Sequence, residues 1–293
     1  MSFRLEMLQV ARVAPKILGE SAELVREFLL GQQNEDGGFR DRAGRSDLYY
    51  TMFALDGLLA LRAELPAERV TRFLESFGAG DGLDFVHLCC LARAWAALGG
   101  KISPETRDGI LQRANQFRSK DGGFHVTPGN ATGSAYGCFL GLGVHQDLGA
   151  ELPEPLGLVQ CLKFLETRDG AWTNERQMPI GSTNATAAAV TVLRHLALPI
   201  NLGVADWLWQ QQHSQGGFIA APRTPIPDLL STATALHALT GLGRDLDPLR
   251  ESCLDFVDSL WTNAGAFHGH WDDEVVDAEY TFYGLLALGH LTS

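Results

Sequence analysis

The sequence predicts an all-α fold in which one domain, spanning residues 1–293, closes into an α6/α6 barrel of six helix hairpins. Three observations predict this fold: a glycine turn that recurs along the chain, an alternation of amphipathic and strongly apolar helices, and an apolar helix at the end of the sequence. Recurrence of one supersecondary unit is typical of proteins whose units bury each other's apolar faces.

The recurrent turn has the pattern Asp-Gly-Gly-Phe or a close variant of it. Five copies are Asp36–Phe39, Asp121–Phe124, Asp169–Trp172, Gln215–Phe218 and Ala264–Phe267, and a weaker copy covers Asp81–Asp84. With Phe39, Leu83, Phe124, Trp172, Phe218 and Phe267 as anchors, the intervals are 44, 41, 48, 46 and 49 residues. Because glycine permits a left-handed backbone and stops a helix, each turn should divide one hairpin into two helices.

Each unit begins with an amphipathic helix and ends with a more apolar one. The amphipathic segments, such as 21–33 and 104–117, should face solvent, and the apolar segments, such as 50–61, 185–198 and 231–242, should be enclosed. Prolines mark the predicted starts of outer helices, with two polar residues as caps: Pro66, Pro104, Pro153 and Pro248, and Ser103 and Asp247. This order predicts six outer and six inner helices.

The final segment, 280–293, is an apolar helix, whereas an open array of repeats ends in a polar capping unit. We therefore expect this helix to pack against the first hairpin and to close the ring. In a closed ring the inner helices all start at one end, so their positive dipole ends surround the mouth of a central funnel.

Composition excludes several classes of function. The net charge is −12, which disfavours binding to nucleic acid through a broad positive field. No run of 18 apolar residues occurs, so we expect no integral membrane segment and a cytoplasmic protein. The five cysteines lie in apolar helical segments without a CxxC motif, so they are predicted to be buried free thiols: Cys89, Cys90, Cys138, Cys161 and Cys253.

Polar residues that commonly cap helices occupy the predicted start of each inner helix: Asp47, Asp84, Asn130, Ser182, Asp228 and Asp277. Such residues cap helices for stability alone, so a cap by itself does not indicate a site. Residues two and three positions further on should point toward the funnel axis. Only the sixth unit has a second carboxylate there, in Asp277, Glu279 and Tyr280.

The segment before this carboxylate pair is the most polar in the chain and contains His268, His270, Asp272 and Asp273. Two interpretations stay open for it. The histidines and acids could bind a metal ion, or the segment could be a solvated loop. Glu279 near an apolar cavity could likewise act as a general acid with a raised pKa.

The glycine turns, the repeat length and the segments GQQNEDGGF and PDLLSTATAL make the whole chain resemble protein prenyltransferase β-subunits and squalene-type cyclases. The resemblance implies an α/α toroid with an isoprenoid in its apolar centre. It also implies that aromatic residues line this centre, namely Tyr49, Tyr50, Tyr136, Phe139, Trp172, Phe282 and Tyr283, and we expect Trp271 beside Tyr280 at the mouth.

The resemblance does not extend to the family's zinc ligands. In the prenyltransferases an Asp-x-Cys and a later His bind zinc, whereas here Leu230 follows Asp228 and Tyr280 stands at the histidine position. We therefore expect neither a metal nor a cofactor. Arg223 is the single remaining candidate for the family's diphosphate-binding cations.

The cyclase motif Asp-x-Asp-Asp is also incomplete, because Leu230 occupies the proton-donating position in the fifth unit. The sixth unit offers Glu279 in the same frame, with Asp277 and Tyr280 beside it. Two hypotheses follow: an enzyme that transfers or cyclises an isoprenoid, and a non-catalytic barrel that binds a lipid-like ligand or a partner protein. The sequence leaves open whether a partner subunit or a homo-oligomer is required.

Overall fold

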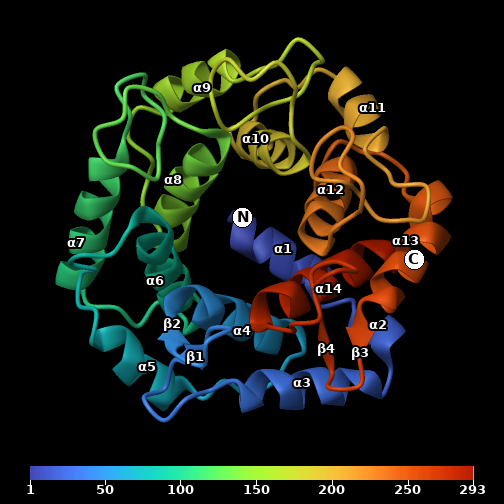
Figure 1. The fold of residues 1–293 in the computed structure, drawn as a ribbon. Helices are drawn as coiled ribbons and strands as arrows, with labels where there is room; N and C mark the ends of the chain where they lie inside the picture. The colour runs from blue at the N-terminus through green and yellow to red at the C-terminus, as the bar shows by residue number, and fades with distance from the viewer. Residues whose placement is uncertain (293) are drawn as a thin grey trace.

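A computed structural model describes residues 1–292, in which paired helices form two concentric rings (Figure 1). The inner helices are α4 (Leu48–Ala60), α6 (Phe85–Ala97), α8 (Ala135–Asp147), α10 (Thr183–His195), α12 (Leu229–Gly241) and α14 (Ala278–Leu291). The outer helices are α3 (Ser21–Gly31), α5 (Ala67–Glu75), α7 (Pro104–Ala114), α9 (Pro155–Phe164), α11 (Gly203–Trp209) and α13 (Arg250–Ser259). No helix of this part of the chain is long and apolar enough to cross a membrane.

The inner helices start where the sequence predicts, with one exception. Asp47, Asp84, Ser182, Asp228 and Asp277 each cap their helix by accepting a backbone N–H with the side chain. The prediction for Asn130 is wrong, because the cap of α8 is Ser134, which accepts the N–H of Gly137 at 2.9 Å.

The aromatic anchors explain this register. The backbone N–H of Ser134 donates to the carbonyl of Phe124, ten residues earlier, as Ser182 does to Trp172 and Asp228 to Phe218. This bond fixes the start of the inner helix relative to the glycine turn. Asn130 lies inside the loop, where its side chain accepts the N–H of Thr132.

The glycine turns form the same short antiparallel pairing in five units. Each anchor aromatic pairs with the residue six positions earlier, as in Phe39 with Gln33 and Phe218 with Gln212. In the last unit this pairing extends into the hairpin of β3 (Trp261–Thr262) and β4 (Ala266–Phe267). In the first unit Phe39 also pairs with the segment that follows it, as β1 (Phe39–Arg40) with β2 (Ser46–Asp47). The repeat predicted from sequence is therefore a repeat of structure.

The starts of the outer helices agree less well with the prolines. Pro104 begins α7 with Ser103 as its cap, as predicted. Pro153 precedes the helix by two residues, since α9 begins at Pro155. Asp247 and Pro248 form the short 3₁₀ helix η2 (Asp247–Leu249) ahead of α13, so Asp247 does not cap α13. A second 3₁₀ turn, η1 (Asn115–Phe117), extends α7.

The ring is closed, as predicted. Helix α14 packs between α12 and α4, so the last unit covers the apolar face of the first (Figure 1). Residues along α14 such as Phe282, Leu285 and Leu286 are buried. The five cysteines are free and buried, which confirms their predicted structural role.

One helix lies inside the inner ring and was not predicted (Figure 1). Helix α1 (Phe3–Ala11) packs against α14, α4 and α8, and the short helix α2 (Pro15–Leu18) connects it to the first hairpin. Its polar contacts all reach the C-terminal ends of inner helices: Arg4 pairs with Asp56, and Glu6 with Arg194 and His195. Helix α1 therefore closes one end of the barrel and leaves the capped end as the mouth.

Candidate active site

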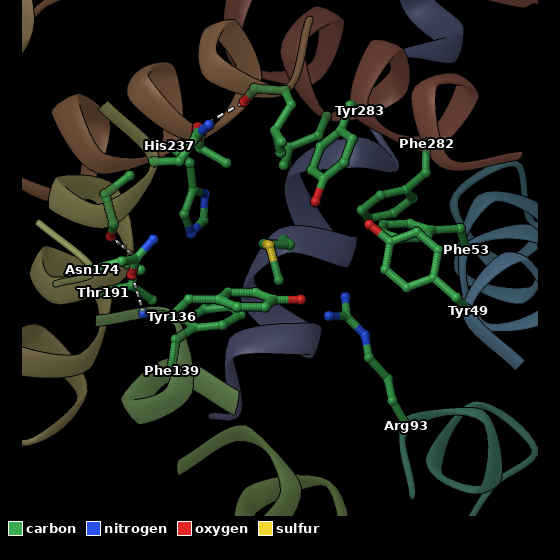
Figure 2. Close-up of a pocket in the computed structure, with 17 residues that line it drawn as sticks. Tyr49, Phe53, Arg93, Tyr136, Phe139, Asn174, Thr191, His237, Phe282 and Tyr283 are labelled. Carbon is green, nitrogen blue, oxygen red and sulfur yellow. Dashed lines mark hydrogen bonds between the residues drawn. The ribbon is translucent and has the colours of Figure 1, made fainter. Parts of the chain in front are cut away.

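A central cavity of about 310 Å³ lies between the mouth and helix α1 (Figure 2). Its wall comes from positions two, five, six and nine residues after the helix caps, a spacing that places side chains on one face of a helix. Met7 of α1 and Asn174, from the loop before α10, complete the wall. The residues from the inner helices are Tyr49, Phe53, Arg93, Tyr136, Phe139, Asn184, Ala187, Ala188, Thr191, Leu230, Thr234, His237, Phe282, Tyr283 and Leu286.

Aromatic side chains form much of this wall. Five of the residues predicted to contact a substrate line the cavity: Tyr49, Tyr136, Phe139, Phe282 and Tyr283. Phe53, which was not predicted, stacks edge-on against Tyr49 with ring centroids 4.9 Å apart. The ring faces supply a surface that suits apolar or cationic groups.

Four other predicted residues lie elsewhere. Trp172 is buried in its own hairpin, where its indole N–H donates to the carbonyl of Leu162. Trp271, in the loop before α14, donates its indole N–H to the hydroxyl of Ser259 at the end of α13. Arg223 is exposed. Tyr50, one residue beyond Tyr49, is not part of the cavity wall.

Glu279 lies at the mouth, two residues after the cap of α14. The hydroxyl of Tyr49 donates to its Oε1 at 2.6 Å, so Tyr49 connects the carboxyl group to the cavity. Burial raises the pKa of Glu279 to about 7, and the Tyr49 hydrogen bond acts in the opposite direction. About half of the Glu279 side chains would therefore be protonated near neutral pH.

Arg42 forms an ion pair with the neighbouring carboxylate, Asp277. Its Nε donates to Oδ2 of Asp277 at 2.8 Å, and its Nη2 donates to Oδ2 of Asp273 at 2.9 Å. The guanidinium also lies over the ring of Tyr280, 5.4 Å from its centroid. Asp277 thus caps α14 and holds the mouth loop. Burial raises its pKa despite the arginine.

The residues of the fifth and sixth units do not fit zinc. Leu230 faces the cavity, while the carboxylate of Asp228 accepts both the N–H and the hydroxyl of Ser231. His268 is turned toward the carbonyl of His270 within its own loop. Among residues 1–292 no three His, Cys, Asp or Glu side chains are grouped as metal ligands. The described residues therefore offer no metal site for the chemistry of the cavity.

The closed end of the cavity carries charged residues that sequence reasoning missed. Arg93 donates from Nε to Oδ2 of Asp56 at 2.8 Å, and Asp56 also accepts from Arg4 at 2.9 Å. His237 lines the cavity near the same depth. Asp56, Arg93 and His237 all lie nine residues after caps that the sequence predicted correctly, so this spacing could have revealed the layer.

A second polar cluster lies at the mouth, where His87 bridges two helix caps. Its Nε2 lies 3.1 Å from Oδ2 of Asp47, and its Nδ1 lies 2.9 Å from Asp84. The hydrogen bond with Asp47 is the main reason that the pKa of His87 rises to about 9. The imidazole is therefore charged at neutral pH and links α4 to α6.

Comparison with known families gives one match. Residues 9–88 and 186–292 match the model of the prenyltransferase alpha-alpha toroid domain. A search of curated protein sequences finds no match.

Solved structures with the same fold include cyclases and a transferase. A variant of the type II terpene cyclase MstE from Scytonema, in complex with geranylgeranyl dihydroxybenzoate, superimposes with a TM-score of 0.60 at 14% identity, over 95% of this chain and 97% of that chain. Protein geranylgeranyltransferase-I of Candida albicans, complexed with GGPP, gives 0.56 at 15% identity, over 98% and 82%. A protein from Actinoplanes gives 0.60 at 15% identity, over 93% and 98%. At these identities the likeness establishes the fold.

Proposed function

This chain belongs to the prenyltransferase alpha-alpha toroid family, and we propose that its cavity binds an isoprenoid or similar apolar molecule and protonates it to start a cyclisation. The observation that carries the proposal is the half-buried Glu279 carboxyl group, hydrogen-bonded to Tyr49 at the rim of an aromatic cavity. Both the binding and the chemistry depend on this arrangement.

The cavity favours an apolar ligand. Its volume of about 310 Å³ lies at the lower end of the range usual for small-molecule sites. Aromatic rings on α4, α8 and α14 supply apolar surface, and Ala187 and Ala188 of α10 leave room opposite them. An isoprenoid chain has the flexibility and the apolar surface to fill such a space.

The mouth favours acid chemistry. The proposed step starts from the protonated Glu279, whose carboxyl group donates its hydrogen bond to the Tyr49 oxygen. The Tyr49 hydroxyl proton passes to an alkene carbon, and the Glu279 proton replaces it on Tyr49. The carboxylate and a carbocation remain. Ring faces of Phe53 and Tyr283 stabilise the cation. Attack by a second alkene closes the ring, and loss of a proton to water ends the reaction, after which solvent at the mouth reprotonates Glu279.

Prenyl transfer is less well supported, because a diphosphate at the mouth would meet mostly carboxylates. Arg42 is already paired with Asp273 and Asp277, and Arg223 is exposed on its loop. A dianionic group there would be repelled by Glu279 once that residue ionises.

A non-catalytic barrel is the second candidate. The observation that favours it is that Tyr49, rather than the carboxyl group of Glu279, forms the cavity wall. In that case the cavity would hold a lipid-like molecule, and Glu279 would only orient Tyr49.

Native mass spectrometry and product analysis separate these candidates. The purified protein is examined for bound lipid, oligomeric state and a co-purifying partner subunit, and elemental analysis of the same sample is expected to find no stoichiometric zinc. It is then incubated with farnesol and geranylgeraniol, and gas chromatography with mass detection identifies cyclic isomers. We expect Glu279→Gln to bind the same alcohols but to lose turnover by roughly 10²–10⁴-fold.

Binding without products in the wild-type protein would support the non-catalytic barrel. Equal turnover by wild type and Glu279→Gln would refute the assignment of the acid. Absence of binding to both alcohols and to a carboxylic acid with the same isoprenoid chain would refute the isoprenoid proposal.

A further inference from the structure

Arg93 carries unused hydrogen-bonding capacity at the closed end of the cavity. Its Nε is bonded to Asp56, but its Nη2 is buried without a hydrogen-bond partner among the described residues. Figure 2 shows the guanidinium group directed toward the centre of the cavity. A smaller space of about 80 Å³, lined by Arg4, Arg93 and Asp147, adjoins this end.

Two acids, Asp56 and Asp147, lie near the two arginines at this end. Asp56 accepts hydrogen bonds from both Arg4 and Arg93, so two guanidinium groups share one carboxylate. Asp147 is the other acid that interacts with both arginines, and burial raises its pKa to about 6. At pH 7.5 both acids are ionised and balance the two arginines, so the unpaired Nη2 of Arg93, and not a net positive charge, is what would bind a carboxylate.

Leaving a buried guanidinium donor unpaired costs free energy, and a ligand oxygen can remove that cost. The planar fork of arginine matches the two oxygens of a carboxylate better than a single hydroxyl. Arg93 lies nine residues after its cap, whereas Glu279 lies two residues after its own, which separates the two levels by roughly 10 Å along the barrel.

We propose that the ligand is an isoprenoid with a terminal carboxylate, which Arg93 binds at the closed end while the apolar chain extends toward Glu279. This inference rests on the proposed function, because it assumes an isoprenoid in the cavity. It also sets the direction of the substrate. A carbocation close to Arg93 would be repelled, so protonation takes place at the mouth, where aromatic rings and Glu279 lie.

Binding of three farnesyl probes tests this inference at pH 7.5. Farnesoic acid, farnesol and farnesylamine have the same chain and differ at the end group. We expect the acid to bind at least tenfold more tightly than the alcohol, and the amine to bind most weakly, as measured by isothermal titration calorimetry. Arg93→Met should abolish the preference for the acid. Arg45→Met, a matched change at an arginine that is 81% exposed, should retain it.

The outcomes distinguish failure of the proposed function from failure of the carboxylate site. If none of the probes binds, the proposed function fails. If the alcohol binds as tightly as the acid to the wild-type protein, or if Arg93→Met keeps the preference, the carboxylate site is refuted while the isoprenoid cavity stands. Should thermal melting show that Arg93→Met does not fold, Arg93→Gln replaces it, because the amide retains a donor for Asp56.

Discussion

The pKa of Glu279 results from two opposing effects. Burial raises it, and the hydrogen bond from Tyr49 lowers it by favouring the carboxylate. Since the proposed acid must be protonated before each turnover, Tyr49 sets the upper end of the useful pH range. The same hydroxyl would relay the proton, so a change at this residue affects both protonation and transfer.

Tyr49→Phe should therefore raise the pKa of Glu279 above its value of about 7. Infrared titration of the protonated carboxyl band, with Glu279→Gln to identify its contribution, measures this directly and does not require a known substrate. The matched control is Tyr50→Phe, which removes a hydroxyl that makes no hydrogen bond to Glu279 among the described residues. A lower pKa in Tyr49→Phe would contradict the role given to Tyr49.

Residue patterns predicted part of this site. The position of Glu279 follows from the cap of α14, and the aromatic lining on α4, α8 and α14 was expected from the resemblance to the family. Trp172 could not be excluded from the lining by sequence, because anchoring a turn and lining a cavity use the same aromatic residue type. Arg93 was missed because the prediction considered only the positions two and three residues after each cap and not the ninth, where Asp56 and His237 also lie.

At the scale of elements, α1 determines the shape of the cavity. It has no counterpart among the repeats, so repeat analysis could not place it, although its charged residues indicate polar contacts. Glu6 accepts from Nη1 of Arg194 at 2.9 Å and lies 2.7 Å from Nε2 of His195. The bond with His195 is the main reason that the pKa of Glu6 falls to about 2.

Glu6→Ala should weaken the docking of α1, because it leaves the positive charge of Arg194 largely buried without its partner. We expect a loss of about 3 kcal/mol in the free energy of unfolding, measured by urea denaturation. Limited proteolysis should also cleave near α1 sooner in this variant. Glu20→Ala, an exposed position between α2 and α3, is the control and should change stability little.

At the scale of the whole molecule, ring closure makes stability depend on both ends of the chain. Truncation after Glu274 removes α14 and exposes the apolar faces of α12 and α4, which it separates from solvent. We expect aggregation or a molten state with strong binding of a hydrophobic dye. A soluble truncated protein with a cooperative melt would show instead that the repeats are stable as an open array.

Titratable groups inside the barrel respond to acid in opposite directions. Burial lowers the pKa of His237 to about 4 and also lowers that of His290, so the unfolded chain binds these protons first as the pH falls below 6.5. These two histidines therefore lower the stability of the fold as the pH falls from about 6.5 to 4. Glu279 and Asp147 have raised pKa values of about 7 and 6, so they contribute stability that is lost as the pH rises through those values.

These contributions offset each other in the wild-type protein between about pH 4.5 and 6.5, so its stability should vary little there. Glu279→Gln removes one of the opposing groups. We expect the variant to match the wild type near pH 4.5 and to exceed it above pH 7, by at most about 3 kcal/mol, because a half-buried ionised carboxylate is gone. Its own stability should then fall more steeply on acidification, as the histidines are no longer offset.

Urea denaturation from pH 4.5 to 8.5 measures both trends, with the exposed Glu274→Gln as a control that should run parallel to the wild type. A difference between Glu279→Gln and wild type that stays constant with pH would mean that Glu279 titrates as an ordinary surface carboxylate, and it would remove the basis for using this residue as an acid at neutral pH.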